Sequence, residues 1–169
     1  QKDLNTVNYQ NKGTLGISKQ YEMLKNLELS KNQFSEIKKY CDKIGIEFMA
    51  TPFDCDSLKF LNDLNIKKIK ISSGEITNGP LIWQAAKSKS HMIVSTGMAT
   101  KNEIKTCLST IYHALNHNKE PKTLNEIKAF SNKLINFEVL KKTVSLLHCT
   151  SQYPTPFEEI NLKAIKSLK

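Results

Sequence analysis

Apolar residues gather in four short runs along the chain, and each run breaks into Ser or Thr next to Gly or Pro. These runs lie in residues 46–54, 66–75, 91–99 and 144–154. Each contains four or five residues rich in Ile, Val, Leu, Met or Phe. Continuous apolar runs favour strands that are buried on both faces of a sheet. The pattern therefore predicts four such strands.

Helical patterns occupy the stretches around these runs. They span residues 30–45, 54–65, 80–88, 100–118 and 161–169. Ser30 is a typical N-cap, Gly45 a typical helix end, and apolar side chains between them recur at i, i+3 and i+4. Pro80 suits the first turn of a helix. Thr100 with Glu103 three residues later forms a capping-box pattern.

The order of strand, loop and helix repeats with a regular spacing. The strand ends at Thr51, Ser73 and Thr96 are 22 and 23 residues apart, which is typical of βα units in a parallel sheet. The next strand end, Thr150, follows 54 residues later. We interpret the extra length, residues 116–142, as an insertion on the rim, away from the strand ends. Four units fit an open doubly wound α/β sheet or half of a (β/α)₈ barrel.

Hydroxyl groups cluster at all four predicted strand ends, where chemistry collects in both of these folds. The clusters are Thr51, Ser72–Ser73, Ser95–Thr96 and Thr150–Ser151. Any one of them is explained by capping of the following helix. Together, hydroxyls and free backbone N–H groups form a cradle for an anion such as phosphate. Lys70, inside an apolar strand, would add a positive charge, so the combination favours an anion site.

Three further residues near these ends are candidates for binding or catalysis. Glu75 suits an acid, a base or an acceptor for a sugar hydroxyl, but it also suits the favourable charge of a helix N-terminus. Asn78 lies in the same turn. Tyr153 lies in a YPTPF segment whose two prolines favour an extended, rigid loop over the strand ends.

The histidines and cysteines point to no metal site in this chain. We interpret His148, in an apolar strand, as a packed and hydrogen-bonded core residue. His113 and His117 share a helix face, but few carboxylates lie near them in the sequence, which disfavours a metal pair. The four cysteines form no C-x-x-C pair and are expected to be free thiols in a reducing cytoplasm.

The composition argues against two classes of partner. The formal net charge is +9, but all 25 basic residues are lysines spread along the chain. Nucleic-acid sites usually depend on arginine, so we expect no nucleic-acid partner. The apolar runs are too short to span a bilayer, so we also expect no membrane partner and a cytoplasmic protein.

Four segments in order carry a resemblance to a known family. They read MATPFD, KISSGEITNGPL, IVSTGMAT and LLHCTSQYPTPFEEINLKAI. Together they resemble the bacterial sialic acid synthases, the N-acetylneuraminate synthase family. The earlier segment NYQNKGTLGISKQYEMLKNLEL resembles the part of that family before its third barrel strand. The resemblance covers nearly the whole chain apart from residues 116–142.

The resemblance implies a (β/α)₈ catalytic barrel followed by an antifreeze-like domain, usually in a swapped homodimer. Residues 1–169 would be about the third to sixth strands with their helices. The implied reaction condenses phosphoenolpyruvate with N-acetylmannosamine to give sialic acid and phosphate, with Mn²⁺ or another divalent ion holding the sugar aldehyde. A legionaminic or other nonulosonic acid synthase is a close alternative. A non-catalytic phosphate- or sugar-binding fragment, or a decayed gene product, is an alternative of another class.

The resemblance also implies roles for individual residues. The phosphate contacts would be Thr51, Lys70, Ser73, Ser95 and Ser151, the last standing where some members have Asn. Glu75 would face the reacting substrate, and Tyr153 and Asn78 would lie near the sugar. The family's catalytic glutamate and a second lysine would precede Gln1, and its metal-binding histidines would follow Lys169. We therefore expect the metal ligands outside this chain, and the chain alone to be inactive.

Overall fold

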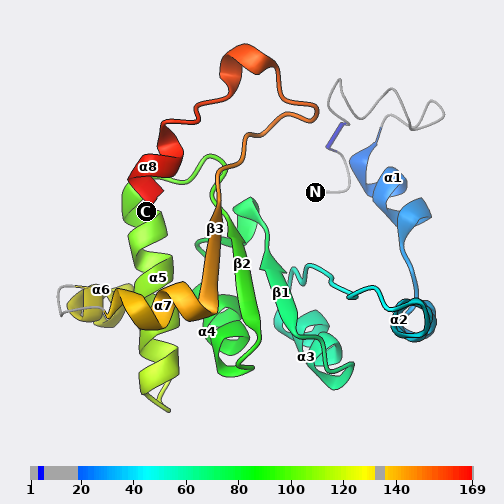
Figure 1. Cartoon of the computed structure of the whole chain (residues 1–169), viewed down its shortest axis with the longest axis horizontal. Helices are drawn as coiled ribbons and strands as arrows, with labels where there is room; N and C mark the ends of the chain where they lie inside the picture. The colour runs from blue at the N-terminus through cyan, green and yellow to red at the C-terminus, as the bar shows by residue number, and fades with distance from the viewer. Residues whose placement is uncertain (1–3, 6–18, 132–135, 169) are drawn as a thin grey trace.

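Three parallel strands form the sheet in the computed structural model, which describes residues 4–5, 19–131 and 136–168 (Figure 1). The strands are β1 (Lys68–Ile71), β2 (His91–Ser95) and β3 (Val144–Leu147), in the order β1-β2-β3. The register pairs Lys70 with Ile93 and Ile93 with Ser145. The prediction of an α/β fold with parallel strands is thus confirmed, and the three carboxyl ends lie at one edge of the sheet.

The prediction of a strand in residues 46–54 is wrong. The structure has only an isolated parallel bridge there, between Ala50 and Ile69. Pro52 is fully buried and Phe48 and Ala50 pack against the core, but Met49 and Phe53 are 44% and 62% exposed, so only part of the segment is covered within the described residues. A segment that pairs on one side only, with only some of its side chains buried, gains too little free energy to form a continuous ladder.

Helices lie where the sequence patterns place them, and further helices lie in residues 20–27, 124–131 and 137–143. They are α1 (Gln20–Leu27), α2 (Lys31–Ile44), α3 (Cys55–Asp63), α4 (Gly79–Lys87), α5 (Lys101–Asn116), α6 (Leu124–Ser131), α7 (Phe137–Thr143) and α8 (Ala164–Leu168), with 3₁₀ turns η1 (Ser73–Glu75) and η2 (Phe157–Glu159). Both predicted caps are confirmed: Ser30 and Thr100 each accept a hydrogen bond from the backbone N–H three residues on. Gly45 ends α2 at φ 75°, a left-handed conformation that favours glycine.

One face of the sheet is buried and the other is open. Ile69, Ile71, Met92 and Val94 are fully buried in one cluster with side chains of α3, α4 and α5. Since side chains alternate along a strand, Lys68 and Lys70 of β1 lie on the other face. The predicted burial on both faces is therefore wrong for the described part of the chain. The alternation of Lys and Ile in β1 is the pattern of a sheet with one open face.

The helices after α5 lie toward the start of β3. α6 packs beside α5, and α7 runs directly into the first residue of β3. Ile127 of α6 and Leu140 of α7 are buried. Figure 1 shows both helices at the opposite end of β3 from the long loop that leads to η2. Within the described ranges, no helix has the length and apolar character needed to cross a membrane.

Candidate functional site

The turn after β1 is the most tightly organised part of the strand-end edge. Ser73–Glu75 forms one 3₁₀ turn, and the N–H of Glu75 donates to the Ser72 carbonyl at 3.0 Å. The N–H of Asn78 then donates to the Glu75 carbonyl at 2.9 Å. The chain therefore reverses within a few residues and enters α4 at Gly79.

Glu75 and Asn78 are joined through their side chains. The Asn78 Nδ2 donates to Glu75 Oε2 at 2.7 Å, and the Asn78 Oδ1 accepts from the Leu81 N–H at 3.3 Å. Asn78 is thus the N-cap of α4, with Pro80 in the first turn as the sequence predicted. The carboxylate of Glu75 is held by the same residue that begins the helix.

Ser73 links the first strand end to the second. Its Oγ accepts a hydrogen bond from the Gly97 N–H at 3.0 Å. A Cβ at position 97 would lie 2.9 Å from Ser73 Oγ and 3.4 Å from Cys149 Cβ, so any larger residue would displace the Ser73 hydroxyl. The residues that follow β1, β2 and β3 therefore meet around Gly97.

The end of β2 is buried and fastened to β3. Ser95 is 3% exposed and pairs in register with Leu147. The Thr96 N–H and its Oγ1 both donate to the Leu147 carbonyl, at 3.1 and 2.8 Å. The Thr96 hydroxyl thus helps to hold the end of β2 to the end of β3, and the Ser95 side chain is buried next to it.

Two polar atoms at this edge are buried without a hydrogen-bond partner in the described residues. They are Ser72 Oγ after β1 and His148 Nε2 after β3. The expectation that His148 is a hydrogen-bonded core residue is therefore wrong at Nε2. Buried polar atoms are nearly always paired, so these two retain unused hydrogen-bonding capacity at the candidate site.

Lys70 and Thr51 approach the same edge from β1 and its neighbouring segment. Lys70 is half-buried and forms no ion pair with any residue in the described ranges. Lys68, on the same face, is instead paired with Glu47 at 2.5 Å. Thr51 follows directly after the Ala50–Ile69 bridge, which places its backbone beside β1. Lys70 is thus the uncommitted cation of this strand.

The loop after β3 holds the remaining candidates in a different setting. Ser151 is exposed and Tyr153 is 60% exposed. The hydroxyls of Thr150 and Thr155 lie 2.5 Å apart, and Thr155 Oγ1 donates to the Gln152 carbonyl at 3.0 Å. These hydrogen bonds close the loop on itself. Among the described residues, no hydrogen bond or ion pair joins Ser151 or Tyr153 to Glu75 or Lys70.

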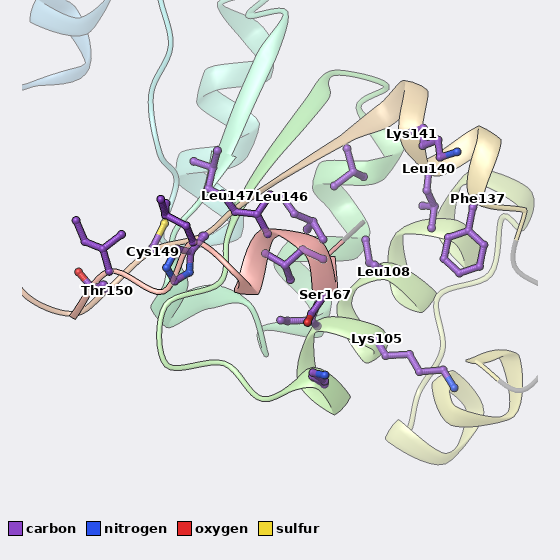
Figure 2. Close-up of a pocket in the computed structure, with 18 of the residues that line it drawn as sticks. Lys105, Leu108, Phe137, Leu140, Lys141, Leu146, Leu147, Cys149, Thr150 and Ser167 are labelled. Atoms are coloured by element: carbon purple, nitrogen blue, oxygen red, sulfur yellow. The ribbon is translucent and has the colours of Figure 1, made fainter. Parts of the chain in front are cut away.

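Tyr153 lines an apolar groove instead. The groove has a volume of about 1340 Å³ and lies between α5, α7, β3 and α8. Figure 2 shows Leu108, Leu140 and Leu146 on its walls and Thr150 at one end. Lys70, Ser73 and Glu75 do not line it. The groove is therefore separate from the turn after β1, and its mostly hydrocarbon walls suit packing more than phosphate binding.

The described residues offer no donor set for a divalent metal. No three His, Cys, Asp or Glu side chains gather within them. The rings of His113 and His117 stack at 4.2 Å beside Trp83, and burial, with the neighbouring His117, lowers the pKa of His113. We therefore derive no chemical step through a metal from this chain.

Sequence reasoning missed two of the contacts that shape the site. The Ser73–Gly97 hydrogen bond joins residues 24 apart, and no sequence pattern marks it. The capping role of Asn78 had a signal, because Asn two residues before Pro is a typical helix start. The side-chain contact to Glu75 follows from that cap once the turn is known.

Fold and site together define a class of protein. It is an α/β protein with parallel strands whose carboxyl ends carry hydroxyls, a glutamate and an uncommitted lysine. The model of the NeuB family matches residues 1–169, and the chain belongs to that family.

Individual relatives agree with this assignment. An N,N'-diacetyllegionaminic acid synthase of Legionella pneumophila is 37% identical over 99% of this chain and 41% of its own length. An N-acetylneuraminate-9-phosphate synthase of Drosophila melanogaster is 30% identical over 92% of this chain and 34% of its own length.

A solved structure supports the fold. The N-acetylneuraminic acid (sialic acid) synthetase of Leptospira borgpetersenii superposes with a TM-score of 0.67 at 31% identity, covering 88% of this chain and 44% of that one. The chain thus spans between 34% and 44% of the length of these relatives.

Proposed function

We propose that this chain is part of a nonulosonic acid synthase that condenses phosphoenolpyruvate with an N-acetylated amino sugar and releases phosphate. N-acetylmannosamine, which would give sialic acid, is the first candidate sugar. The observation that supports this most is the meeting of the three strand ends around Gly97 in a chain of the NeuB family. It gathers polar groups from β1 and β2 at the edge where α/β proteins bind substrates.

The finer architecture belongs to the same proposal. We propose that residues 1–169 form part of a (β/α)₈ barrel, with residues 116–142 as an insertion before β3. A homodimer of the complete protein is proposed on the family resemblance. Mn²⁺ or another divalent ion is proposed as its cofactor, with ligands outside this chain.

The residues of this chain would act mainly on phosphoenolpyruvate. We propose that its phosphate is held by Thr51, Lys70, Ser73, Ser95 and Ser151. The Lys70 ammonium would offset the phosphate charge, and the hydroxyls would fix its oxygens. Carbon 3 of phosphoenolpyruvate would attack the sugar aldehyde, water would add at carbon 2, and phosphate would leave. Glu75 would face the aldehyde, where it would hold or move a proton.

The proposed sugar contact is at Tyr153, in the loop after β3. Tyr153 is proposed near the amino sugar, although its loop lies apart from the turn after β1 in this structure. A legionaminic acid synthase is the second candidate, because the legionaminic acid synthase reported above is more similar to this chain than the N-acetylneuraminate-9-phosphate synthase is.

The experiment is an assay of the complete protein that carries this chain. We would measure phosphate release with phosphoenolpyruvate, Mn²⁺ and either N-acetylmannosamine or the diacetylated hexosamine precursor of legionaminic acid. Release that requires one of these sugars supports the proposal and selects the substrate. Binding of phosphoenolpyruvate without turnover of either sugar would instead favour a non-catalytic binding module.

A further inference from the structure

The side chain of Asn78 is engaged on both sides of its amide. Its Oδ1 accepts from the Leu81 N–H, and its Nδ2 donates to Glu75 Oε2 at 2.7 Å. A backbone N–H requires an acceptor, so the carbonyl oxygen of the amide must face Leu81. The NH₂ group is then directed toward Glu75. The helix cap thereby sets the orientation of the group that holds the carboxylate.

The helix that Asn78 caps is well packed in its first turn. Leu81 and Ile82, in the first turn of α4, are 0% and 1% exposed and belong to the main hydrophobic cluster. Asn78 is therefore anchored to a packed helix, and its own N–H also donates to the Glu75 carbonyl. A polar side chain held in this way has little freedom to reorient.

Glu75 has no competing contact of this strength among the residues described. No ion pair involves its carboxylate there, and the charged residue of the preceding strand, Lys70, is not within salt-bridge distance of it. One carboxylate oxygen is held by Asn78, which leaves Oε1 for a substrate.

We infer that Asn78 is a positioning residue for Glu75. The inference rests on the proposed function, in which Glu75 faces the reacting aldehyde. The Asn78 amide fixes the direction of the carboxylate through a charge-assisted hydrogen bond. The amide oxygen and one N–H are already committed within the turn, which fixes the plane of the amide against Glu75 and α4.

The simpler alternative is that Asn78 only caps α4, and the variants Asn78→Asp and Asn78→Ser together separate the two roles. Asp caps a helix as well as Asn does. It has no N–H to donate, however, and it places a second carboxylate against Glu75, which raises the pKa of the pair. Asn136→Asp is a matched control, because Asn136 caps α7 by accepting from the Glu138 N–H at 3.0 Å.

We would measure kcat, both KM values and the Glu75 carboxyl pKa by carbon-13 NMR in the complete protein. In Asn78→Asp, we expect kcat to fall about 10- to 100-fold, the scale of a lost supporting hydrogen bond to an active-site group. Both KM values should stay within about threefold and the Glu75 pKa should rise. Asn136→Asp should change none of these. Wild-type kcat and Glu75 pKa in Asn78→Asp would overturn the inference.

The NMR titration separates this inference from the proposed function, since it needs no turnover. If Asn78→Asp raises the Glu75 pKa in a protein that condenses neither sugar, the proposed function is wrong but the contact between Asn78 and Glu75 is supported. Turnover with an unchanged Glu75 pKa in Asn78→Asp would do the reverse. Asn78→Ser removes the hydrogen bond without adding a charge, because Ser keeps a capping oxygen but is too short to reach Glu75. Unchanged kcat in Asn78→Ser would overturn the inference.

Discussion

The turn after β1 and the loop after β3 were both expected to serve one site, yet the structure builds them differently. The first turn is half-buried, joined to α4 through Asn78 and to β2 through the Ser73–Gly97 hydrogen bond. The loop after β3 is largely exposed, with Phe157 at 90%, and its hydroxyl hydrogen bonds stay within residues 150–155.

The difference lies in what fixes each segment. The first turn is fixed by the adjoining helix α4 and by Gly97, which lies 24 residues from Ser73, so its side chains are placed before any substrate arrives. The loop after β3 is held mainly by its own residues, and segments of this kind open locally at low free energy. We therefore expect changes in the first turn to affect chemistry, and changes in the loop to affect local order.

Gly97→Ala should have the largest effect, because Gly97 is where the two segments approach each other. The added Cβ would lie 2.9 Å from Ser73 Oγ and would displace it. We expect a loss of about 1–3 kcal/mol in the free energy of unfolding from overpacking. In the complete protein, kcat/KM should fall about 100-fold, since displacements near 1 Å have that cost.

The control for this change is Gly79→Ala. A Cβ at position 79 meets no atom within 4 Å, and α4 should tolerate alanine there. Urea unfolding and steady-state kinetics of both variants would test the expectation. Wild-type kinetics in Gly97→Ala would show that the approach of the strand ends is unimportant for the reaction.

Lys70→Ala should have the next largest effect. We expect the KM for phosphoenolpyruvate to rise about 10- to 100-fold, because a hydrogen bond to a charged group is worth about 1.5–3 kcal/mol. Lys68→Ala is the matched control from the same face of β1. Its ion pair with Glu47 is about two fifths exposed on each side, so its loss should change little. An effect of Lys70→Ala on the sugar KM alone would contradict the phosphate assignment.

Asn78→Ala should destabilise the protein by about 1 kcal/mol, the usual cost of a lost N-cap. Asn136→Ala removes an equivalent cap from α7, away from the strand ends. Urea unfolding of the two variants should give similar losses, while only Asn78→Ala should lower kcat. The same kcat in both variants would mean that the reaction depends no more on the turn after β1 than on the distant end of α7.

The features that the sequence predicted well depend on residues close together in the chain or on a regular spacing. The capping boxes at Ser30 and Thr100, the helix end at Gly45 and the parallel strands each depend on residues a few positions apart. Local hydrogen bonding and periodicity decide such features, so a single sequence contains the information.

The features that could not be predicted depend on neighbours distant in the chain. Residues 46–54 have a strand-like pattern, but only Ala50 pairs with β1, because pairing needs cover for the exposed Met49 and Phe53. The Ser73–Gly97 contact depends on how closely two strand ends approach, which packing determines. The gathering of hydroxyls at one edge was predictable from topology, but their individual partners were not.

Thr155→Val should have the smallest effect and should be confined to the loop after β3. It removes the hydroxyl that donates to the Gln152 carbonyl and contacts Thr150. We expect chymotrypsin to cleave after the exposed Phe157 about 2- to 10-fold faster, as a loss of about 0.5–1.5 kcal/mol in local stability predicts. The global free energy of unfolding should change by less than about 0.5 kcal/mol. Thr143→Val, which removes a hydroxyl bonded to the Val139 carbonyl in α7, should leave this cleavage unchanged. A global loss as large as the local one would show that the loop is coupled to the sheet as tightly as the turn after β1.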